Sequence, residues 1–300
     1  MTSTITARLL GPLSIDQYRG TVDDADTSDH ADLPGGGALN MAFHWARRGL
    51  EVEVISRVSS DRSELFDAFC DRHGINSTPD LIADGPACTV DIRFADDRQP
   101  VMDQFVEGVL ADVRVTVDEA DRLFGASPSH LVLVEVVDRE LHRLAAERLV
   151  GAAPLTGDFL SARHLTVERF AATLRHLDIG FVGWPGRPDD AGATELANRA
   201  VEASSLLVMT FGSQGVRVID GRTERRRDHW FEVDPVEVIG TTVGCGDAFI
   251  AAFLAEWYRS ERIDAAVDAG RALGAEATSW LRPLPDHAYH WPARGVTVCV

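Results

Sequence analysis

The sequence has no lysine: all 29 basic residues among its 300 residues are arginine. This absence excludes enzymes that form a Schiff base through lysine, ATPases with a Walker A loop, and protein kinases of the eukaryotic type. Each of these classes needs a lysine ammonium at a fixed position. If the protein binds phosphate, it must therefore use backbone N–H groups, helix N-termini, metal ions or arginine.

Basic residues are far fewer than acidic residues. The chain carries 47 acidic against 29 basic residues, for a formal net charge of −18. An anionic surface repels both nucleic-acid backbones and acidic lipid head groups. We therefore expect neither nucleic acid nor a membrane surface as a partner. The basic cluster at residues 225–227 is flanked by acidic residues and is interpreted as a solvated turn.

Cysteines are few and far apart, at Cys70, Cys88, Cys245 and Cys299. None forms a C-x-x-C pair or a zinc-type spacing, so free thiols in a reducing compartment are expected. The first sixteen residues lack the apolar stretch of a signal peptide, and no run approaches the ~18 apolar residues of a membrane span. These features predict a soluble, cytoplasmic protein.

The hydrophobic pattern predicts an α/β fold. With 45% hydrophobic and 25% charged residues, the composition is that of a globular protein. Short apolar runs typical of buried strands alternate with amphipathic stretches typical of helices. Strands are predicted at 6–11, 52–56, 130–137, 179–183 and 206–211, and helices at 39–50, 138–150 and 193–204. Buried strands joined by helices indicate a doubly wound, mostly parallel sheet with ligands at the carboxyl ends of its strands.

One region interrupts the alternation of strands and helices. From Asp80 to Phe105, turn-like residues separate strand-like pieces without a helix between them. This pattern predicts an antiparallel flap, and the polar segment after Ile15 is expected to add strands to it. We therefore predict one domain over residues 1–300, with lid strands inserted at about 15–33 and 80–106. Such a sheet suits a lid or a homodimer surface.

The sharpest local signal is the run of Gly244, Cys245, Gly246 and Asp247 at the start of a predicted helix. The two glycines allow the main-chain N–H groups to converge at a helix N-terminus, which favours a bound anion. Asp247 in the first turn is placed to accept a proton from a hydroxyl that attacks phosphorus. The alternative is a glycine turn in which Asp247 only complements the helix dipole.

A second glycine-rich segment also opens a predicted helix. Residues 35–37 are three glycines, of which Gly35 and Gly36 would let a ligand lie against the main chain. Asn40 supplies a donor and an acceptor for hydroxyl groups. Asp16 follows the first predicted strand and is placed to bind two sugar hydroxyls. The alternative for Asp16 is an exposed loop carboxylate.

The order of these motifs resembles the ribokinase-like (PfkB) carbohydrate kinases over nearly the whole chain. The resemblance implies an α/β body with a β lid, and ATP and Mg²⁺ as cofactors. It implies that Asp247 deprotonates a sugar hydroxyl while the main chain of Gly244, Cys245 and Gly246 stabilises the transferring phosphoryl group. It further implies sugar-binding positions at Asp16, Gly35, Gly36 and Asn40, and nucleotide-binding positions at Thr210, Gly212 and Gly215.

Within that family the chain most resembles the fructoselysine 6-kinase type. The likeness lies in residues 107–112, 155–159 and 177–182. It implies a ketose or an amine-linked ketose as the phosphoryl acceptor. Glu135, on a predicted central strand, either reaches the substrate pocket or pairs with a buried arginine.

Three positions depart from the family pattern. Residues 183–186 read Gly-Trp-Pro-Gly where many relatives carry Asn-x-x-Glu, so the metal ligands stay unassigned. Residues 241–243 lack the usual acidic residue, and residues 59–61 lack a usual glycine. The alternatives are therefore a nucleoside kinase of the same fold or a non-catalytic sugar or nucleotide sensor. Retention of Asp247 and both neighbouring glycines favours catalysis.

Overall fold

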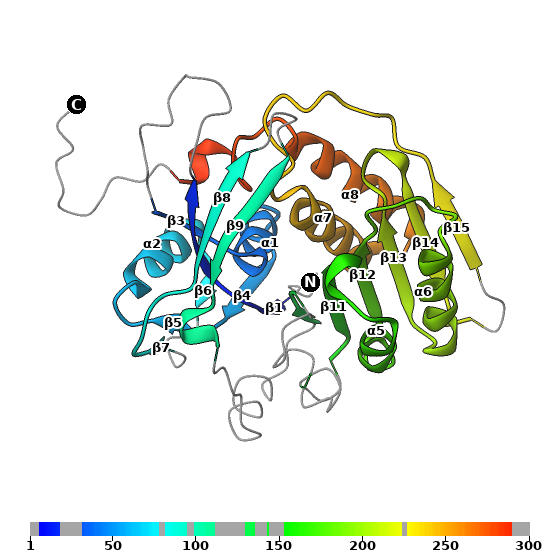
Figure 1. Cartoon of the computed structure of the whole chain (residues 1–300), viewed down its shortest axis with the longest axis horizontal. Coiled ribbons are helices and arrows are strands. Elements are labelled where there is room, and N and C mark those ends of the chain that lie inside the picture. Colours follow the sequence, from blue (N-terminus) through cyan, green and yellow to red (C-terminus); the bar gives the residue numbers. More distant parts are fainter. Residues whose placement is uncertain are drawn as a thin grey trace.

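The computed structural model describes residues 6–18, 32–77, 82–94, 99–111, 130–135, 143, 153–223 and 227–289. Its centre is a nine-stranded sheet in the order β15-β14-β13-β12-β11-β10-β1-β4-β6 (Figure 1). Neighbouring strands are parallel from β6 to β13. β14 is antiparallel to β13, and β15 is antiparallel to β14. The strands are β1 (Thr6–Leu10), β4 (Glu51–Ile55), β6 (Asn76–Ser77), β10 (His130–Leu133), β11 (Leu155–Ser161), β12 (Ile179–Gly183), β13 (Leu206–Thr210), β14 (Val216–Asp220) and β15 (Arg227–Phe231).

Both faces of the large sheet are buried. In β13, Leu206 and Val208 join one hydrophobic cluster, while Leu207 and Met209 join a second cluster on the opposite face. Alternate side chains of a strand point to opposite faces, so a continuous apolar run fits a strand covered on both sides. This arrangement explains why the strands read as unbroken apolar runs in the sequence.

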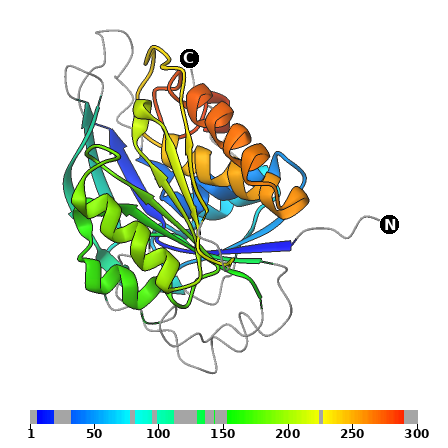
Figure 2. The same cartoon turned by 90° about the vertical axis from the view of Figure 1, so that its right-hand side faces the viewer.

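Helices cover the two faces and confirm the doubly wound prediction. The first cluster takes residues from α1 (Gly37–Ala46), α2 (Ser63–His73), α7 (Cys245–Ser260) and α8 (Ile263–Ala277). The second cluster takes residues from α5 (Val167–Leu174) and α6 (Ala191–Glu202). Figure 2 shows α7 and α8 in orange on one side of the sheet and α5 and α6 in green on the other. Short 3-10 turns are η2 (Gly108–Leu110), η3 (Ala162–His164), η4 (Gly212–Gln214) and η5 (Asp286–Ala288).

Helices α1 and α7 run side by side in the same direction. The Asn40 side chain contacts Asp247 near both N-termini, and one turn further on the Trp45 indole donates a buried hydrogen bond to the Ala251 carbonyl at 2.7 Å. The contacts follow the same order along both helices. The positive ends of two helix dipoles therefore lie at the same place.

A separate four-stranded sheet has the order β3-β2-β8-β9. Its strands are β2 (Ser14–Tyr18), β3 (Asp32–Gly35), β8 (Thr89–Phe94) and β9 (Pro100–Val106). The pairs β2–β3 and β8–β9 are antiparallel, but β2 and β8 join the two hairpins in parallel. Parallel pairing needs a long crossover, and residues 19–88 connect β2 to β8. The division of the chain into one domain of residues 1–300 stays a prediction.

The small sheet contains less of the segment at 80–106 than predicted. β7 (Ile82–Ala83) pairs with β5 (Val58–Ser59) in a separate two-stranded sheet, so the start of the segment at 80–106 lies outside the small sheet. Ser60 extends that pairing by donating its backbone N–H to the Ala83 carbonyl at 2.9 Å. From this segment the small sheet takes only β8 and β9, which follow Cys88.

The remaining predictions divide into three groups. The five predicted strands are present, although the strand predicted at 130–137 ends at Leu133 because Glu135 takes a positive φ of 61°. The helices predicted at 39–50 and 193–204 are present as α1 and α6. The helix predicted at 138–150 and the turn at 225–227 lie wholly or largely outside the described residues, as does Cys299. The other three cysteines are free thiols, as expected.

No helix within the described residues combines the length and apolar character needed to cross a bilayer.

Candidate active site

The N-terminus of α7 is a tight glycine turn. Gly244 is the N-cap, with φ of 75°, and a Cβ at this position would stand 2.6 Å from the Pro283 main chain. Only glycine fits both conditions. At Gly246, in contrast, a Cβ would meet no atom within 4 Å. The first hydrogen bond within the helix runs from Ala248 N to Gly244 O. The N–H groups that precede Ala248 therefore have no hydrogen-bond acceptor inside the helix.

The N-terminus of α1 lies opposite this turn. The Asn40 Nδ2 donates a hydrogen bond to Asp247 Oδ2 at 2.7 Å. Asn40 is 4% exposed, and its Oδ1 has no hydrogen-bond partner among the described residues. The two glycine-rich segments that the sequence singled out therefore meet in space. Asn40 and Asp247 connect them across 207 positions of the chain.

The Asp16 carboxylate lies against the α-carbon of Gly35. A Cβ on Gly35 would overlap with that carboxylate, and a Cβ on Gly36, where φ is 100°, would stand 2.5 Å from the Pro12 carbonyl oxygen. Asp16 is buried, with Ser14 Oγ donating to its Oδ1 at 2.8 Å. Burial raises the pKa of Asp16 to about 7, with the charge of Asp247 adding to the effect and the Ser14 hydrogen bond opposing it.

Two further carboxylates complete the group. Glu135 follows β10, and its Oε1 accepts a long hydrogen bond from Gly37 N at 3.4 Å. Asp158 lies on β11, is 3% exposed, and its Oδ1 accepts from Leu160 N at 2.9 Å. The pairing of β11 with β12 shifts register after Asp158, and Leu160 has a positive φ of 52°. Bulges of this kind re-aim a side chain next to a functional site.

Burial raises the pKa of all four carboxyl groups, and the charge of Asp247 raises the pKa values of the other three further. Burial raises the pKa of Glu135 to about 8, that of Asp158 to about 7 and that of Asp247 to about 6. The negative charge of Asp247 is the next largest cause of the raised pKa of both Glu135 and Asp158, whereas the Asn40 hydrogen bond lowers the pKa of Asp247. Not all four groups are therefore ionised together near neutral pH.

The position of this group follows from the sheet topology. The chain moves outward from β1 to β4 and β6 in one direction, and from β10 to β13 in the other. Strand order therefore reverses between β1 and β10, which is where open α/β sheets bind ligands. Glu135 follows β10 directly at this point. A Cβ on Gly11, just after β1, would stand 2.8 Å from the Cβ of Val134, so the two strand ends approach closely.

The sequence left Glu135 undecided between a substrate pocket and a buried arginine. Within the described residues, Glu135 forms no ion pair, and the charged groups that shift its pKa are Asp247, Asp158 and Asp16. The described residues thus give no support for pairing with a buried arginine, and a contact of Glu135 with substrate stays a prediction. Asp158 was noted only within a family-like segment. An acidic residue near the carboxyl end of an apolar strand is the signal that identifies it.

The predicted nucleotide-binding residues lie at the end of β13. Thr210 ends that strand, its carbonyl accepts from Trp184 N at 2.8 Å, and Gly212 begins η4 with φ of 58°. Gly215 has φ of 145°, and a Cβ there would overlap with the Trp230 ring and approach the Phe231 carbonyl. The structure groups these residues with the loop after β12.

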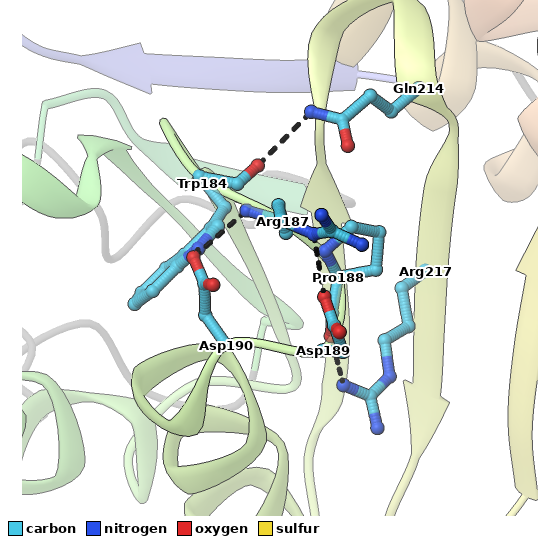
Figure 3. A network of polar contacts seen from close by, with 8 residues as sticks. Trp184, Arg187, Pro188, Asp189, Asp190, Gln214 and Arg217 are labelled. Carbon is cyan, nitrogen blue, oxygen red and sulfur yellow. Dashed lines mark hydrogen bonds and ion pairs between the residues drawn. The ribbon is translucent and has the colours of Figure 1, made fainter.

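That loop, residues 184–190, is held by hydrogen bonds within it and by one from η4 (Figure 3). The Trp184 indole Nε1 donates to Asp190 Oδ2 at 3.0 Å, and Arg187 N donates to the same oxygen at 2.8 Å. Gln214 Nε2 from η4 donates to the Gly186 carbonyl at 3.1 Å. The Asp190 carboxylate is thus occupied within the loop. No group of three or more acidic, histidine or cysteine side chains in the described ranges is arranged to hold a metal ion.

Comparison with known proteins agrees with this geometry. The sequence model of the pfkB family carbohydrate kinases matches residues 179–280. Fructoselysine 6-kinases of Shigella flexneri and Escherichia coli (strain K12) are each 24% identical to the chain over 263 residues, which is 82% of this chain and 90% of each relative.

Several solved structures share the fold. A microbiome-derived acarbose kinase superimposes with a TM-score of 0.75 at 15% identity, covering 93% of this chain and 94% of that one. An adenosine kinase from Sinorhizobium meliloti has a TM-score of 0.75 at 17% identity, covering 95% and 97%. A putative ribokinase II from E. coli, in complex with ATP and Mg²⁺, has a TM-score of 0.71 at 15% identity, covering 93% and 94%.

Proposed function

We propose that this chain, which belongs to the PfkB family of carbohydrate kinases, uses Asp247 as the general base when it phosphorylates a hydroxyl of a small sugar or sugar derivative. The observation that carries the proposal is the convergence of the α1 and α7 N-termini, joined by the hydrogen bond from Asn40 to Asp247. A base, hydroxyl-binding groups and an anion-binding helix end are thereby brought together.

Asp247 has the environment of a general base. Burial raises its pKa to about 6, and a base with a pKa near the working pH transfers protons efficiently. Asn40 occupies Oδ2 and so fixes the orientation of the carboxylate. Oδ1 lies 3.2 Å from the point where a Cβ on Gly37 would stand. A side chain at Gly37 would therefore crowd this oxygen, and glycine keeps it unobstructed on that side.

The first turn of α7 supplies the electrophilic half of the site. N–H groups of Gly244, Cys245 and Gly246, together with the helix dipole, would bind the transferring phosphoryl group and stabilise its charge. This arrangement requires no lysine, in agreement with the composition. We assign Thr210, Gly212 and Gly215 to the ATP site. Thr242 Oγ1, just before this turn, is 2.9 Å from Gln99 Oε1, so the segment leading to β9 contacts it.

Mg²⁺ is expected to accompany ATP, where it would neutralise phosphate charge. The described residues include no group of side chains arranged to bind it. The acidic residues of the loop after β12 are Asp189 and Asp190, and both are hydrogen-bonded to Arg187. Magnesium is commonly held by substrate phosphates, water and one or two carboxylates. We assign it no protein ligand, and no proposed step passes through the ion.

Asp16 and Asn40 are assigned to the acceptor. The Asp16 carboxylate, fixed by Ser14 and pressed against Gly35, accepts hydrogen bonds from sugar hydroxyls. Asn40 Oδ1 is a further free acceptor. The names of the curated relatives favour a ketose or an amine-linked ketose as the substrate.

A screen for ADP release tests this function. Purified protein with ATP and Mg²⁺ is given ketoses, aldoses, amine-linked sugars and nucleosides, with a sample lacking acceptor as the background. We expect release with one or more sugars. Release with nucleosides alone would favour a nucleoside kinase. Detectable binding of acceptors with no release across the whole panel would favour a non-catalytic sensor and overturn the proposal.

Two glycine substitutions separate chemistry from folding. In Gly246→Ala the added methyl meets no neighbour within 4 Å, so Tm is expected to stay within a few degrees. The methyl would nevertheless stand at the proposed phosphoryl position and move the phosphoryl group away from the N–H donors. Because one such donor contributes about 10²–10³-fold, kcat is expected to fall at least about tenfold. Gly244→Ala must adopt a φ of 75° against the Pro283 main chain and is expected to lower Tm.

Both properties are measured on the same preparations, by ADP release and by thermal unfolding. Unchanged kcat in a stable Gly246→Ala protein would show that the open space before α7 is not the phosphoryl site.

A homodimer and a cytoplasmic location stay proposals. On β9, the edge strand of the small sheet, Met102 and Phe105 are each 56% exposed. Exposed apolar side chains on an edge strand are typical of a surface that pairs with another chain. Light scattering distinguishes a monomer from a dimer.

A further inference from the structure

Arginine is a means of phosphate binding that the proposed site does not yet use. A chain without lysine is left with main-chain N–H groups, helix N-termini, metal ions and arginine for this purpose. In the proposed site, the first turn of α7 provides the first two and receives the phosphoryl group that is transferred. The other phosphates of ATP carry further negative charge, so a cation is expected beside the nucleotide turn η4.

Figure 3 shows two arginines in the network around η4, and one of them is already committed. Arg217, on β14, donates from Nε and Nη2 to the two carboxylate oxygens of Asp228 at 2.9 and 2.8 Å, and its side chain is only 15% exposed. Arg187 belongs to the loop after β12, where the Gly186 carbonyl accepts a hydrogen bond from Gln214 Nε2 of η4 at 3.1 Å. The backbone of Arg187 is therefore next to the nucleotide turn.

The loop that carries Arg187 has a fixed backbone. Trp184 Nε1 and Arg187 N both donate to Asp190 Oδ2, at 3.0 and 2.8 Å. A Cβ on Gly186 would overlap with that carboxylate, and a Cβ on Gly192 would stand 2.5 Å from the Trp184 ring. The loop is thus closed around Asp190, and the point from which the Arg187 side chain extends is held in place.

The Arg187 side chain, unlike its backbone, is available to a ligand. It is 77% exposed, and in the described structure its guanidinium pairs only with Asp189, through Nε at 3.1 Å. Asp189 is itself 76% exposed, and ion pairs between exposed side chains are weak. The Nη1 and Nη2 atoms of Arg187 donate to no described residue. A guanidinium presents its N–H groups in a planar fork that binds two phosphate oxygens at once.

We propose that Arg187 binds the phosphates of ATP that are not transferred, so that the chain balances part of the charge of the nucleotide with its own cation. This inference rests on the proposed ATP site at Thr210, Gly212 and Gly215. The side chain exchanges Asp189 for phosphate when the nucleotide binds, while the loop keeps its hydrogen bonds. Arg187 is a nucleotide-binding residue and takes no part in activating the acceptor hydroxyl.

Calorimetric titration with ADP in the presence of EDTA measures this contact without metal, acceptor or turnover. Wild-type protein is expected to bind metal-free ADP, and Arg187→Gln to bind it at least about tenfold more weakly, since hydrogen bonds between charged groups are roughly twice as strong as neutral ones. Adenosine has the same base and ribose but no phosphate, and the variant should bind it as the wild type does. An equal loss of affinity for adenosine would place Arg187 at the nucleoside and contradict the inference.

Arg262→Gln is the matched control. Arg262 Nε donates to Asp264 Oδ1 at 3.2 Å, two residues further on, as Arg187 Nε donates to Asp189, and the Arg262 side chain is 68% exposed. It lies in the turn between α7 and α8, at the end of α7 opposite the proposed phosphoryl site. This variant should keep wild-type affinity for ADP. The same loss in both variants would show a general effect of net charge and overturn the assignment.

Two results separate this inference from the proposed function. Wild-type ADP affinity in Arg187→Gln, or binding of ADP by the wild type only when Mg²⁺ is added, would overturn the inference and leave the proposed kinase activity standing. Failure of every panel acceptor to release ADP would refute the proposed function, and the ADP titration would still decide whether Arg187 binds phosphate. In an active enzyme, Arg187→Gln is expected to raise KM for ATP about tenfold or more and to leave KM for the sugar unchanged.

Discussion

Replacement of Asp247 by asparagine is expected to lower kcat by about 10²–10⁴-fold while leaving the fold and ATP binding intact. The amide has almost the same shape as the carboxylate and keeps an oxygen for the hydrogen bond that Asn40 donates at 2.7 Å. It cannot accept the proton of the acceptor hydroxyl. Because the change also removes one negative charge from a group of carboxylates that repel one another, it should not destabilise the protein.

The pH profile identifies the group responsible. A base works in its deprotonated form, and the pKa of Asp247 is raised to about 6. In the wild-type enzyme, kcat is therefore expected to fall about tenfold for each pH unit below that value and to level off above it. The asparagine variant should not show this fall in kcat at low pH.

The matched control is Asp268→Asn, a change of the same kind at a side chain 71% exposed on α8. It should keep both the rate and the pH profile of the wild type. Wild-type turnover in Asp247→Asn would remove this carboxylate from the mechanism.

Replacement of Asp16 by asparagine is expected to lower kcat/KM for the acceptor by about 10–100-fold, because a hydrogen bond to a charged group contributes about 1.5–3 kcal/mol. The carboxylate accepts from hydroxyl donors on both oxygens, whereas an amide has one acceptor oxygen. Since the sugar is held in this way both before and during transfer, the loss should fall mainly on KM. Ser14 can still donate to the remaining oxygen, so the buried position keeps its partner.

Steady-state kinetics with the best acceptor measure this effect. Asp103→Asn serves as control, because Asp103 lies on β9 of the same small sheet and pairs with Arg93 at the surface. A loss confined to kcat with unchanged KM would indicate that Asp16 acts on the reaction and not on sugar binding.

The sequence predicted the body of the fold because each buried strand is a local pattern. The run of apolar residues at 206–211 has no polar interruption, and it forms β13. In contrast, β11 was not predicted as a strand, because Gly157 and Asp158 break its apolar pattern. The parallel pairing of β2 with β8 could not be predicted from the sequence either. It joins segments about 75 residues apart whose own patterns indicate only hairpins.

The candidate site shows the same limit. Glycine turns at 35–37 and 244–246 are local signals, and both were recognised from the sequence. The hydrogen bond from Asn40 to Asp247 depends on the packing of α1 against α7, which no local pattern encodes. The role of Glu135 was undecided and Asp158 was not singled out for a related reason. They come from the neighbouring strands β10 and β11 and lie close to Asp247, and a sequence does not show which charges are neighbours.

The most direct test of the account is a crystal structure of the protein with ADP, aluminium fluoride and the best acceptor from the screen. We expect the fluoride atoms to lie about 3 Å from main-chain nitrogen atoms between Gly244 and Gly246, with an acceptor hydroxyl beside Asp247 Oδ1. Aluminium fluoride bound away from the first turn of α7, or an acceptor whose hydroxyls do not reach Asp247, would contradict the proposed site.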